Sequence, residues 1–270
     1  MDKPAGGTVG KALGLLDEVA AYGRPVRFAE LLAGSDLPKA TLYRLLQTLV
    51  GQRMLAYDEA SHAYALGSRL IRLAHASWQQ TTLAPLARAH LDRLSRAIGE
   101  TVHLAKLDNG QVLYVDKRNA ARPIPMFSDA GKIGPAYCTG VGKAMLAFLD
   151  EPALERALAQ QSWFPHTPHT HTSPQSLRAE LAAIRAESVA FDREEHEPQI
   201  ICVAAPILDA SGRPLGAMSV TSSTLRHSLA DLAAFAPRLR ETAQAVAREA
   251  AAYTFSGATR PDHRPADGGA

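Results

Sequence analysis

The stretch LPKATLYRLLQTLVGQ, residues 37–52, decides the fold of the N-terminal part of the chain. Its apolar residues recur at the spacing of one buried helical face: Leu42, Leu45, Leu46, Leu49 and Val50. The opposite face is free of acidic residues and carries Ala40, Thr41, Tyr43, Arg44, Gln47 and Thr48. A helix that only had to be soluble would usually carry Glu and Lys there. The question is therefore what this face contacts.

The surrounding sequence predicts a winged helix-turn-helix module. Helical spacing over 9–22 ends at Gly23, and a second short helix over 26–34 ends at Gly34. Pro38 suits the first turn of the helix quoted above, because its missing N–H is not needed there. Two strand-like runs, 54–58 and 63–66, follow around a polar turn. Three small helices and a hairpin are typical of this DNA-binding fold.

The chemistry of the polar face fits the major groove of double-stranded DNA. Ala40, Arg44 and Gln47 form one stripe. Arg can donate two hydrogen bonds to guanine, Gln pairs with adenine, and Ala or Thr contacts the thymine methyl group. Lys39 and Thr41, at the helix start, can reach phosphates. Acidic residues would be repelled by the phosphate backbone, so their absence is expected.

Two further residues and one alternative stay open at this point. Tyr43 lies at the boundary of the two faces, where it either contacts DNA or packs on the domain. His62, in the wing, either touches a phosphate or is solvated. The same pattern also fits an amphipathic helix in a winged helix that binds protein.

The remaining chain predicts a larger domain of the α+β class with a mostly antiparallel sheet. Asp108-Asn109-Gly110 is a strong hairpin signal between the alternating runs 101–107 and 111–117. The other expected elements are strands at 203–209 and 215–222 and helices at 140–150, 151–161, 176–188 and 229–252.

The predicted organisation has four parts. They are an all-α winged helix-turn-helix domain at 6–67, a linker helix at 68–81, a GAF-like domain at 82–254 and a disordered tail at 255–270. The linker carries a broad apolar surface that includes Leu70, Ile71, Leu73, Ala74 and Trp78, which predicts packing against a partner and a chain that is not a monomer.

Composition places the chain among cytoplasmic globular proteins. It has 270 residues with 46% hydrophobic content, and no apolar run reaches the roughly 18 residues of a membrane span. The first residues lack the apolar region of a signal peptide. Cys138 and Cys202 lie far apart, which argues against a disulfide scaffold and a cysteine zinc site. The net charge of +2 says little about partners.

Three motifs in this order resemble the IclR family of bacterial transcription regulators over about residues 8–253. LPKATLYRLLQTL (37–49) looks like the family's recognition helix, GVGKAMLAFL (140–149) like its Gly-Lys-Ala helix, and AFDREEHEPQIICVAAPILDASGRPLGAMSVTSS (190–223) like its long C-terminal signature. The resemblance implies a winged-helix domain, a linker helix and a GAF-like effector domain. It also implies an operator on double-stranded DNA and a homodimer or a dimer-of-dimers tetramer. We expect a repressor in preference to an activator, and the sequence leaves both open.

The resemblance also implies an effector pocket for a small metabolite, such as an organic acid, hydroxy-aldehyde or lactone. The expected lining residues are Met126, Gly131, Cys138, Asp192, Cys202, Ser219 and Thr221. Backbone amides around Gly131 can form an anion-binding concavity. Ser219 and Thr221 have a second interpretation, as alternating strand residues on a solvent face. Each cysteine either faces the cavity or is a buried, inert thiol.

No enzyme, metal or cofactor is expected. A cysteine-dependent enzyme, with Cys138 or Cys202 as nucleophile and His103 as base, is the alternative, and it needs a Cys–His pair within hydrogen-bond reach. His166, His169 and His171 lie in a Pro/Thr loop without a neighbouring Cys or acid, which favours an exposed loop over a metal site. Neither GKIGP (131–135) nor GVGKA (140–144) has the spacing of a phosphate-binding P-loop.

Overall fold

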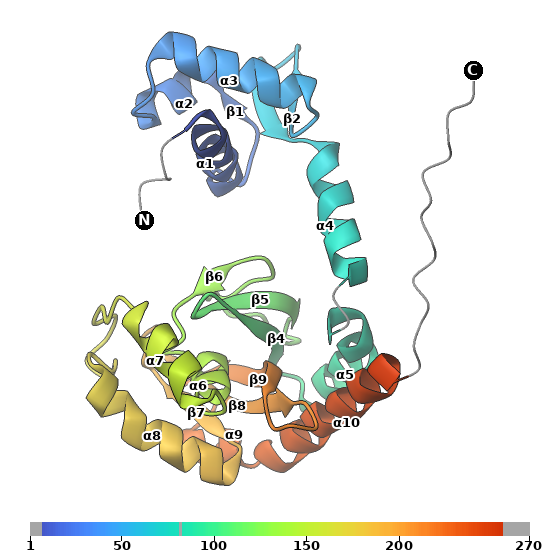
Figure 1. The fold of residues 1–270 in the computed structure, drawn as a ribbon, viewed down its shortest axis with the longest axis vertical. Coiled ribbons are helices and arrows are strands. Elements are labelled where there is room, and N and C mark those ends of the chain that lie inside the picture. Colours follow the sequence, from blue (N-terminus) through green and yellow to red (C-terminus); the bar gives the residue numbers. More distant parts are fainter. Residues whose placement is uncertain (1–6, 81–82, 256–270) are drawn as a thin grey trace. The chain divides into compact units, whose positions relative to one another are not determined.

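The computed structural model describes residues 7–80 and 83–255, which divide into two compact units at residue 80 (Figure 1). The predicted tail lies outside the described residues beyond Phe255. Among the described residues, no helix is long and apolar enough to cross a membrane.

The N-terminal unit contains the predicted helices and wing. Its elements are α1 (Thr8–Ala21), β1 (Val26–Arg27), α2 (Phe28–Gly34), α3 (Lys39–Gly51), β2 (Leu55–Asp58), β3 (Ala63–Leu66) and α4 (Ser68–Gln80). Leu15, Leu42 and Leu46 are at most 1% exposed and form the centre of its core. Helical leucine spacing therefore folds this unit as predicted.

The strand β1 was not predicted, because Val26 and Arg27 were assigned to the following helix. Val26 pairs with Tyr64 of β3 and is fully buried. Arg27 is extended, and its N–H donates to the Glu30 carboxylate at 3.0 Å, so the helix begins only at Phe28. A buried residue paired in a sheet overrides the local helical pattern.

The linker helix α4 continues directly from the wing. Leu70 packs against the core of the N-terminal unit, whereas Ile71 is 73% exposed and Leu73 is 51% exposed. These two apolar side chains therefore form an uncovered surface on α4 in the single chain.

The C-terminal unit is built on an antiparallel sheet with the order β6-β5-β4-β9-β8-β7. The strands are β4 (Thr101–Asp108), β5 (Gln111–Arg118), β6 (Ile133–Gly134), β7 (Ala190–Arg193), β8 (Ile200–Leu208) and β9 (Pro214–Ser223). The short strands β6 and β7 were not predicted. The helices are α5 (Leu83–Ile98), α6 (Gly140–Leu146), α7 (Glu151–Ala159), α8 (Pro174–Glu187), α9 (Leu229–Ala233) and α10 (Ala236–Phe255).

Helices cover both faces of this sheet, which divides the core in two (Figure 1). On one face, Leu91 of α5 and Leu239 of α10 pack with Val220 of β9. On the other face, α6, α7 and α8 pack over the sheet. Because both faces are covered, β8 is buried along nearly its whole length and reads as a continuous apolar run.

The single final helix predicted over 229–252 is wrong in one detail. It is interrupted between Ala233 and Ala236, which separates α9 from α10. Pro237 explains the break, because it lacks an N–H and its ring would clash with the carbonyl of Ala233 in a continuous helix.

Candidate functional site

The exposed face of α3 carries most of the residues that the sequence analysis assigned to DNA. Lys39, Ala40, Tyr43, Arg44 and Gln47 are exposed, and Thr41 is half-buried. The helix buries Leu42, Leu45, Leu46 and Leu49 and has no acidic residue in its first turn. One face is thus anchored on the domain, while the other presents donors without negative charge.

Two of these residues have partners within the domain. Tyr43 is 55% exposed but makes an edge-to-face contact with Phe28, with ring centroids 6.2 Å apart. In the wing, His62 is exposed, and its Nδ1 lies 3.0 Å from the Tyr57 hydroxyl. These contacts give two of the predicted contact residues, Tyr43 and His62, defined orientations.

In the C-terminal unit, strand register gathers polar side chains on the sheet face beneath α6. Asp192 of β7 pairs with Cys202 of β8, and Cys202 pairs with Thr221 of β9. One step along, His103 of β4 pairs with Ser219. Directly opposed residues in antiparallel strands point to the same face. Four strands thus contribute to one buried polar row.

This row forms one wall of a cavity of about 20 Å³. Ser219 and Thr221 are 2% and 5% exposed, so the solvent-face interpretation of these two residues is wrong. The cavity lining consists of His103, Tyr114, Ser128, Thr139, Gly140, Val141, Asp192, His196, Glu197, Ile200, Cys202, Ser219 and Thr221. A cavity of this size holds about one water molecule.

His103 is the centre of the hydrogen-bonding groups in the cavity. Its Nε2 lies 3.1 Å from Ser128 Oγ, and its Nδ1 lies 3.4 Å from Ser219 Oγ and 3.3 Å from Thr221 Oγ1. Burial, together with the Lys117 charge, lowers the pKa of His103 to about 3. The imidazole is therefore neutral, with one nitrogen as donor and the other as acceptor.

The environment of the two thiols disfavours the thiolate form that a catalytic cysteine needs. Burial, followed by the charge of Asp192, raises the pKa of both Cys138 and Cys202. A nucleophilic cysteine needs a lowered pKa and a base in contact. The side-chain partners of His103 given by the geometry are Ser128, Ser219 and Thr221, not a thiol.

Asp192 is buried beside three charged side chains, those of Glu195, Lys143 and Glu197. Desolvation, then the Glu195 charge, raises its pKa to about 8, although the Glu195 N–H donates to its Oδ1 at 2.8 Å. The carboxyl group is 5% exposed and faces the cavity. It is thus a buried polar group that connects the cavity wall to the β7–β8 loop.

Three predicted lining residues are absent from the lining of this cavity. Met126 is half-buried and lies just before Phe127 and Ser128 in the chain, outside the cavity lining. Cys138 is buried in the core under α6. Gly131 is exposed, and its N–H donates to the Tyr114 carbonyl at 2.8 Å. The expected anion site at the Gly131 amide is therefore wrong, because the loop already uses that donor in its hydrogen bond to β5.

Sequence reasoning missed the residues that close the cavity. Ser128 and Glu197 both line it, and the Phe127 N–H donates to Glu197 Oε1 at 2.8 Å. The rings of Phe127 and His196 pack edge to face, with centroids 5.1 Å apart. Glu197 and His196 lie within the motif 190–223, so that motif held a signal for them, whereas nothing local indicated Ser128.

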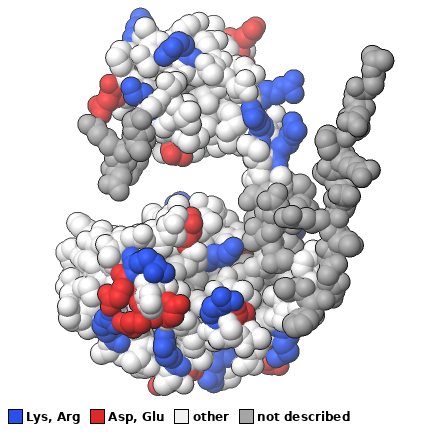
Figure 2. Space-filling view, in the orientation of Figure 1, with Lys and Arg blue, Asp and Glu red and all other residues white. Residues whose placement is uncertain are grey.

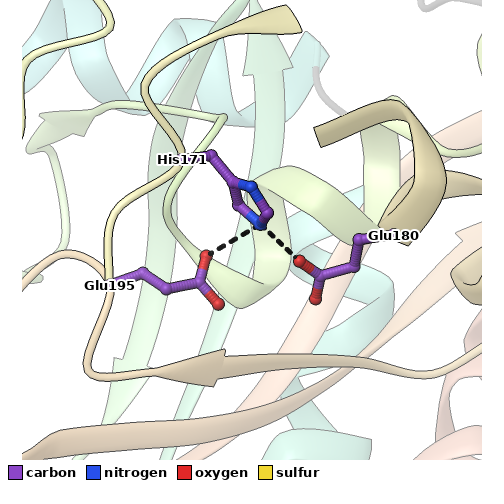
Figure 3. A group of neighbouring side chains, drawn as sticks. All are labelled: His171, Glu180 and Glu195. Atoms are coloured by element: carbon purple, nitrogen blue, oxygen red, sulfur yellow. Dashed lines mark hydrogen bonds and ion pairs between the residues drawn. The ribbon is translucent and has the colours of Figure 1, made fainter. Parts of the chain in front are cut away.

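The three loop histidines have different environments. His169 is exposed, and His166 packs against His196 with ring centroids 4.9 Å apart. The expectation that no acidic residue lies near this run is wrong: His171 Nε2 is 2.6 Å from Glu180 Oε2 and 4.0 Å from Glu195 Oε2 (Figure 3). Helix α8 and the β7–β8 loop bring these carboxylates from distant positions.

Comparison with known proteins supports both units. The family model of the bacterial transcriptional regulator IclR C-terminal region matches residues 75–248, and the IclR helix-turn-helix domain matches residues 8–59. The HTH-type transcriptional regulator XynR of Escherichia coli is 30% identical over 241 residues, which cover 89% of this chain and 96% of XynR. BhcR of Paracoccus denitrificans is 32% identical over 234 residues, 87% of this chain and 84% of BhcR.

A solved structure extends the likeness to the fold. The crystal structure of the Thermotoga maritima IclR has 29% sequence identity and a TM-score of 0.76, covering 90% of this chain and 98% of that one. This chain belongs to the IclR family of bacterial transcriptional regulators, with a DNA-binding helix-turn-helix domain and an effector-binding C-terminal domain.

Proposed function

We propose that this protein is a cytoplasmic repressor whose hold on its operator is controlled by a small hydroxy acid, hydroxy-aldehyde or lactone in the C-terminal cavity. The observation that carries the proposal is the buried polar row of Asp192, Cys202, Thr221, Ser219 and His103. Buried polar groups are costly unless they are satisfied, and a binding site uses a few such groups to orient its ligand.

The groups in the row favour a ligand with both hydroxyl and carbonyl oxygens. Ser219 and Thr221 can each donate or accept, and neutral His103 offers one of each. A ligand hydroxyl can donate to Asp192, and the raised pKa of about 8 leaves this carboxyl largely protonated near neutral pH, so it can also donate to a ligand carbonyl. Hydroxy acids and lactones, which carry both kinds of oxygen, therefore match the row.

Ligand entry requires the cavity wall to move, because about 20 Å³ is too small for an organic acid. The contact between Phe127 and Glu197 and the ring packing of Phe127 on His196 hold that wall closed. A ligand that binds the opened wall better than the closed one shifts the population of states. This difference in affinity supplies the free energy for the change in DNA binding.

We propose that Ala40, Arg44 and Gln47 contact base edges while Lys39, Thr41 and His62 contact the backbone, with Tyr43 at the edge of the interface. The proposal rests on their exposure on α3 and in the wing. The operator is expected to have two related half-sites, because symmetric dimers read such sites.

The first experiment selects bound DNA from a random pool, with and without a library of small acids. The effector found in this way is titrated against a preformed DNA complex of the wild type, Ser219→Ala and Ser222→Ala. Ser222 is the matched control, since it lies on the same strand and its hydroxyl contacts His227 Nδ1 at 3.1 Å instead of the cavity.

Ser219→Ala should raise the effector midpoint about tenfold or more, because losing one partner of a buried hydrogen bond costs roughly 1–3 kcal/mol. DNA affinity without effector should be nearly unchanged, and Ser222→Ala should keep the wild-type midpoint. Identical midpoints for wild type and Ser219→Ala would remove Ser219 from the site. An equal loss of DNA binding without effector would make Ser219 a folding residue.

A cysteine-dependent enzyme is the competing function. The raised pKa values of both thiols and the distribution of the His103 contacts disfavour it. Incubation of each selected ligand with the protein, followed by mass spectrometry, tests this alternative. Recovery of unchanged ligand would agree with a regulator. Conversion of more than one ligand molecule per protein chain would support an enzyme.

A further inference from the structure

We propose that His171, Glu180 and Glu195 bind a divalent transition-metal ion of the zinc class, through His171 Nε2 and one carboxylate oxygen from each glutamate. The three ligand atoms lie within 4.8 Å of one another (Figure 3). Imidazole and carboxylate are both zinc ligands, and a catalytic-type site of three protein ligands leaves a fourth position for water. This site does not depend on the proposed effector.

A buried, unpartnered oxygen points into the cluster. Glu195 is 3% exposed, and its Oε2 has no hydrogen-bond partner within the part of the chain that the structure describes. This oxygen faces His171 Nε2 at 4.0 Å. A buried polar oxygen without a partner costs free energy until a donor or a cation binds it.

The other oxygen of each glutamate is already held. Lys143 Nζ donates to Glu180 Oε1 at 2.9 Å and also to Glu195 Oε1. Arg193 Nη1 donates to Glu180 Oε1 at 2.7 Å. Lys143 is completely buried, so it acts as a fixed internal donor. Because these donors hold the two Oε1 atoms, both Oε2 atoms are left to face His171. Hydrogen bonds of this kind commonly orient carboxylates that bind a metal.

The hydrogen bonds of Ser176 determine the tautomer of His171. Ser176 Oγ donates its single hydrogen to the Ser173 carbonyl at 2.9 Å, so it accepts a hydrogen bond from His171 Nδ1 at 3.2 Å. Nδ1 therefore carries a proton, and Nε2 faces Glu180 Oε2 at 2.6 Å.

When Nε2 and Oε2 are both acceptors, a proton or a metal ion must lie between them. A proton on Nε2 would serve Glu180 alone and leave Glu195 Oε2 unsatisfied. A metal ion would contact all three atoms. Tetrahedral zinc places neighbouring ligand atoms about 3.3 Å apart. His171 Nε2 lies 2.6 Å from Glu180 Oε2 and 4.0 Å from Glu195 Oε2, and the three ligand atoms all lie within 4.8 Å of one another. Small side-chain shifts thus complete the site.

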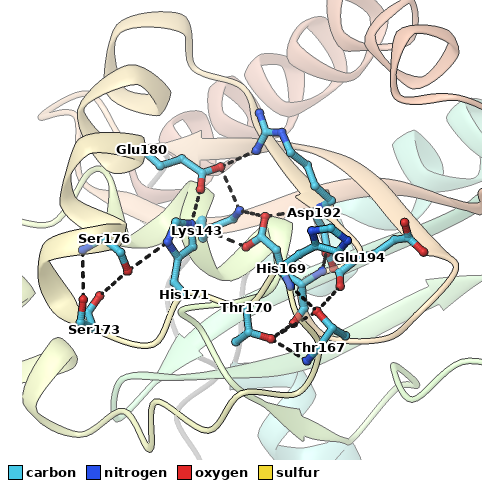
Figure 4. A network of polar contacts seen from close by, with 12 residues as sticks. Lys143, Thr167, His169, Thr170, His171, Ser173, Ser176, Glu180, Asp192 and Glu194 are labelled. Atoms are coloured by element: carbon cyan, nitrogen blue, oxygen red, sulfur yellow. Dashed lines mark hydrogen bonds and ion pairs between the residues drawn. The ribbon is translucent and has the colours of Figure 1, made fainter.

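The backbone that carries Glu195 is fixed independently of any metal. Thr167 Oγ1 donates to the Glu194 carbonyl and Thr170 Oγ1 to the Glu195 carbonyl, both at 2.6 Å (Figure 4). A bound ion would then join the loop of His171, helix α8 and the β7–β8 loop. Because the Glu195 N–H donates to Asp192, the site lies one hydrogen bond from the cavity wall.

The test uses the untagged full-length protein after chelator treatment and buffer exchange. Zinc is titrated by calorimetry and cobalt(II) by visible absorption, in the wild type, His171→Ala, Glu180→Gln and His169→Ala. His169 is the matched control, since it is an exposed histidine of the same loop. Circular dichroism checks that each variant is folded.

We expect one ion per wild-type chain and four-coordinate cobalt absorption. His171→Ala and Glu180→Gln should each lose tenfold or more in zinc affinity, and His169→Ala should bind as the wild type does. Equal affinity in wild type and His171→Ala, or no stoichiometric binding, would overturn the proposal. A sulfur–cobalt charge-transfer band would also overturn it, because that band would place the ion at Cys202 or Cys138.

Discussion

The backbone of Gly140 packs directly against the Sγ atom of Cys202, and any Cβ at position 140 would overlap that sulfur. This contact brings the start of α6 onto the polar row of the sheet and forms one end of the cavity. Gly140, the first glycine of GVGKA, is therefore required by close packing rather than by phosphate binding. The alanine Cβ built at this position would also touch Ala204 at 3.4 Å.

Gly140→Ala should destabilise the C-terminal unit by about 1–3 kcal/mol, the usual cost of overpacking a core. Thermal unfolding measures the effect. Gly51→Ala is the control, since its added Cβ would meet nothing within 4 Å. The double variant with Cys202→Ala should recover much of the loss, because it removes the overlapping sulfur. A double variant no more stable than Gly140→Ala would show that the overlap is not the cause.

His103→Gln should make the free energy of unfolding decrease less steeply as pH falls. Burial and the Lys117 charge lower the pKa of His103 from 6.5 to about 3. Between these values the unfolded chain binds a proton that the folded chain does not, so the free energy of unfolding decreases as pH falls. The slope contributed is at most about 1.4 kcal/mol per pH unit. Urea unfolding at pH 7, 6 and 5 should show a steeper decline in wild type, and parallel declines would contradict this.

Arg44→Ala should lose about 1–3 kcal/mol of discrimination at one base pair, because Arg44 is exposed on α3 in the stripe proposed to contact bases. Lys39→Ala should weaken binding equally on all sequences and reduce the salt slope by about one. Binding of each variant to the selected operator and to its single-base variants separates the two effects. Intact sequence preference in Arg44→Ala would show that another face reads the bases.

The protein should sediment as a closed assembly at micromolar concentration, because Ile71 and Leu73 are exposed on α4. The double substitution Ile71→Ser and Leu73→Ser should weaken that assembly. Analytical ultracentrifugation measures both proteins. A wild type that sediments only as a 28.9 kDa species would refute the prediction.

On the face shown in Figure 2, the charged side chains of the C-terminal unit do not indicate an assembly surface as the exposed apolar side chains of α4 do. Basic and acidic side chains lie interspersed there, and Arg178 pairs with both Glu151 and Glu155. Such exposed pairs contribute little stability each. The apolar side chains of α4 are therefore the better place to perturb assembly.

The sequence by itself determined the elements whose signals are local. Leucines spaced along α3 fixed its buried face, and Asp108-Asn109-Gly110 fixed the turn between β4 and β5. The motifs of both units were sufficient to recognise the family. Ser219 and Thr221 were assigned to the cavity by that resemblance, since alternation alone allowed either face of β9.

Only the tertiary structure decided which distant groups meet. A hydrogen bond from the loop to β5 uses the Gly131 amide and so removes that donor from the anion site that a glycine-rich loop had indicated. Pairing of β4 with β9 placed His103 beside Ser219, and the fold brought Glu180 and Glu195 to His171. Helical and strand periods report on neighbours along the chain, whereas these contacts join residues whose sequence separation carries no period. Their positions follow from register, burial and the packing of helices on the sheet.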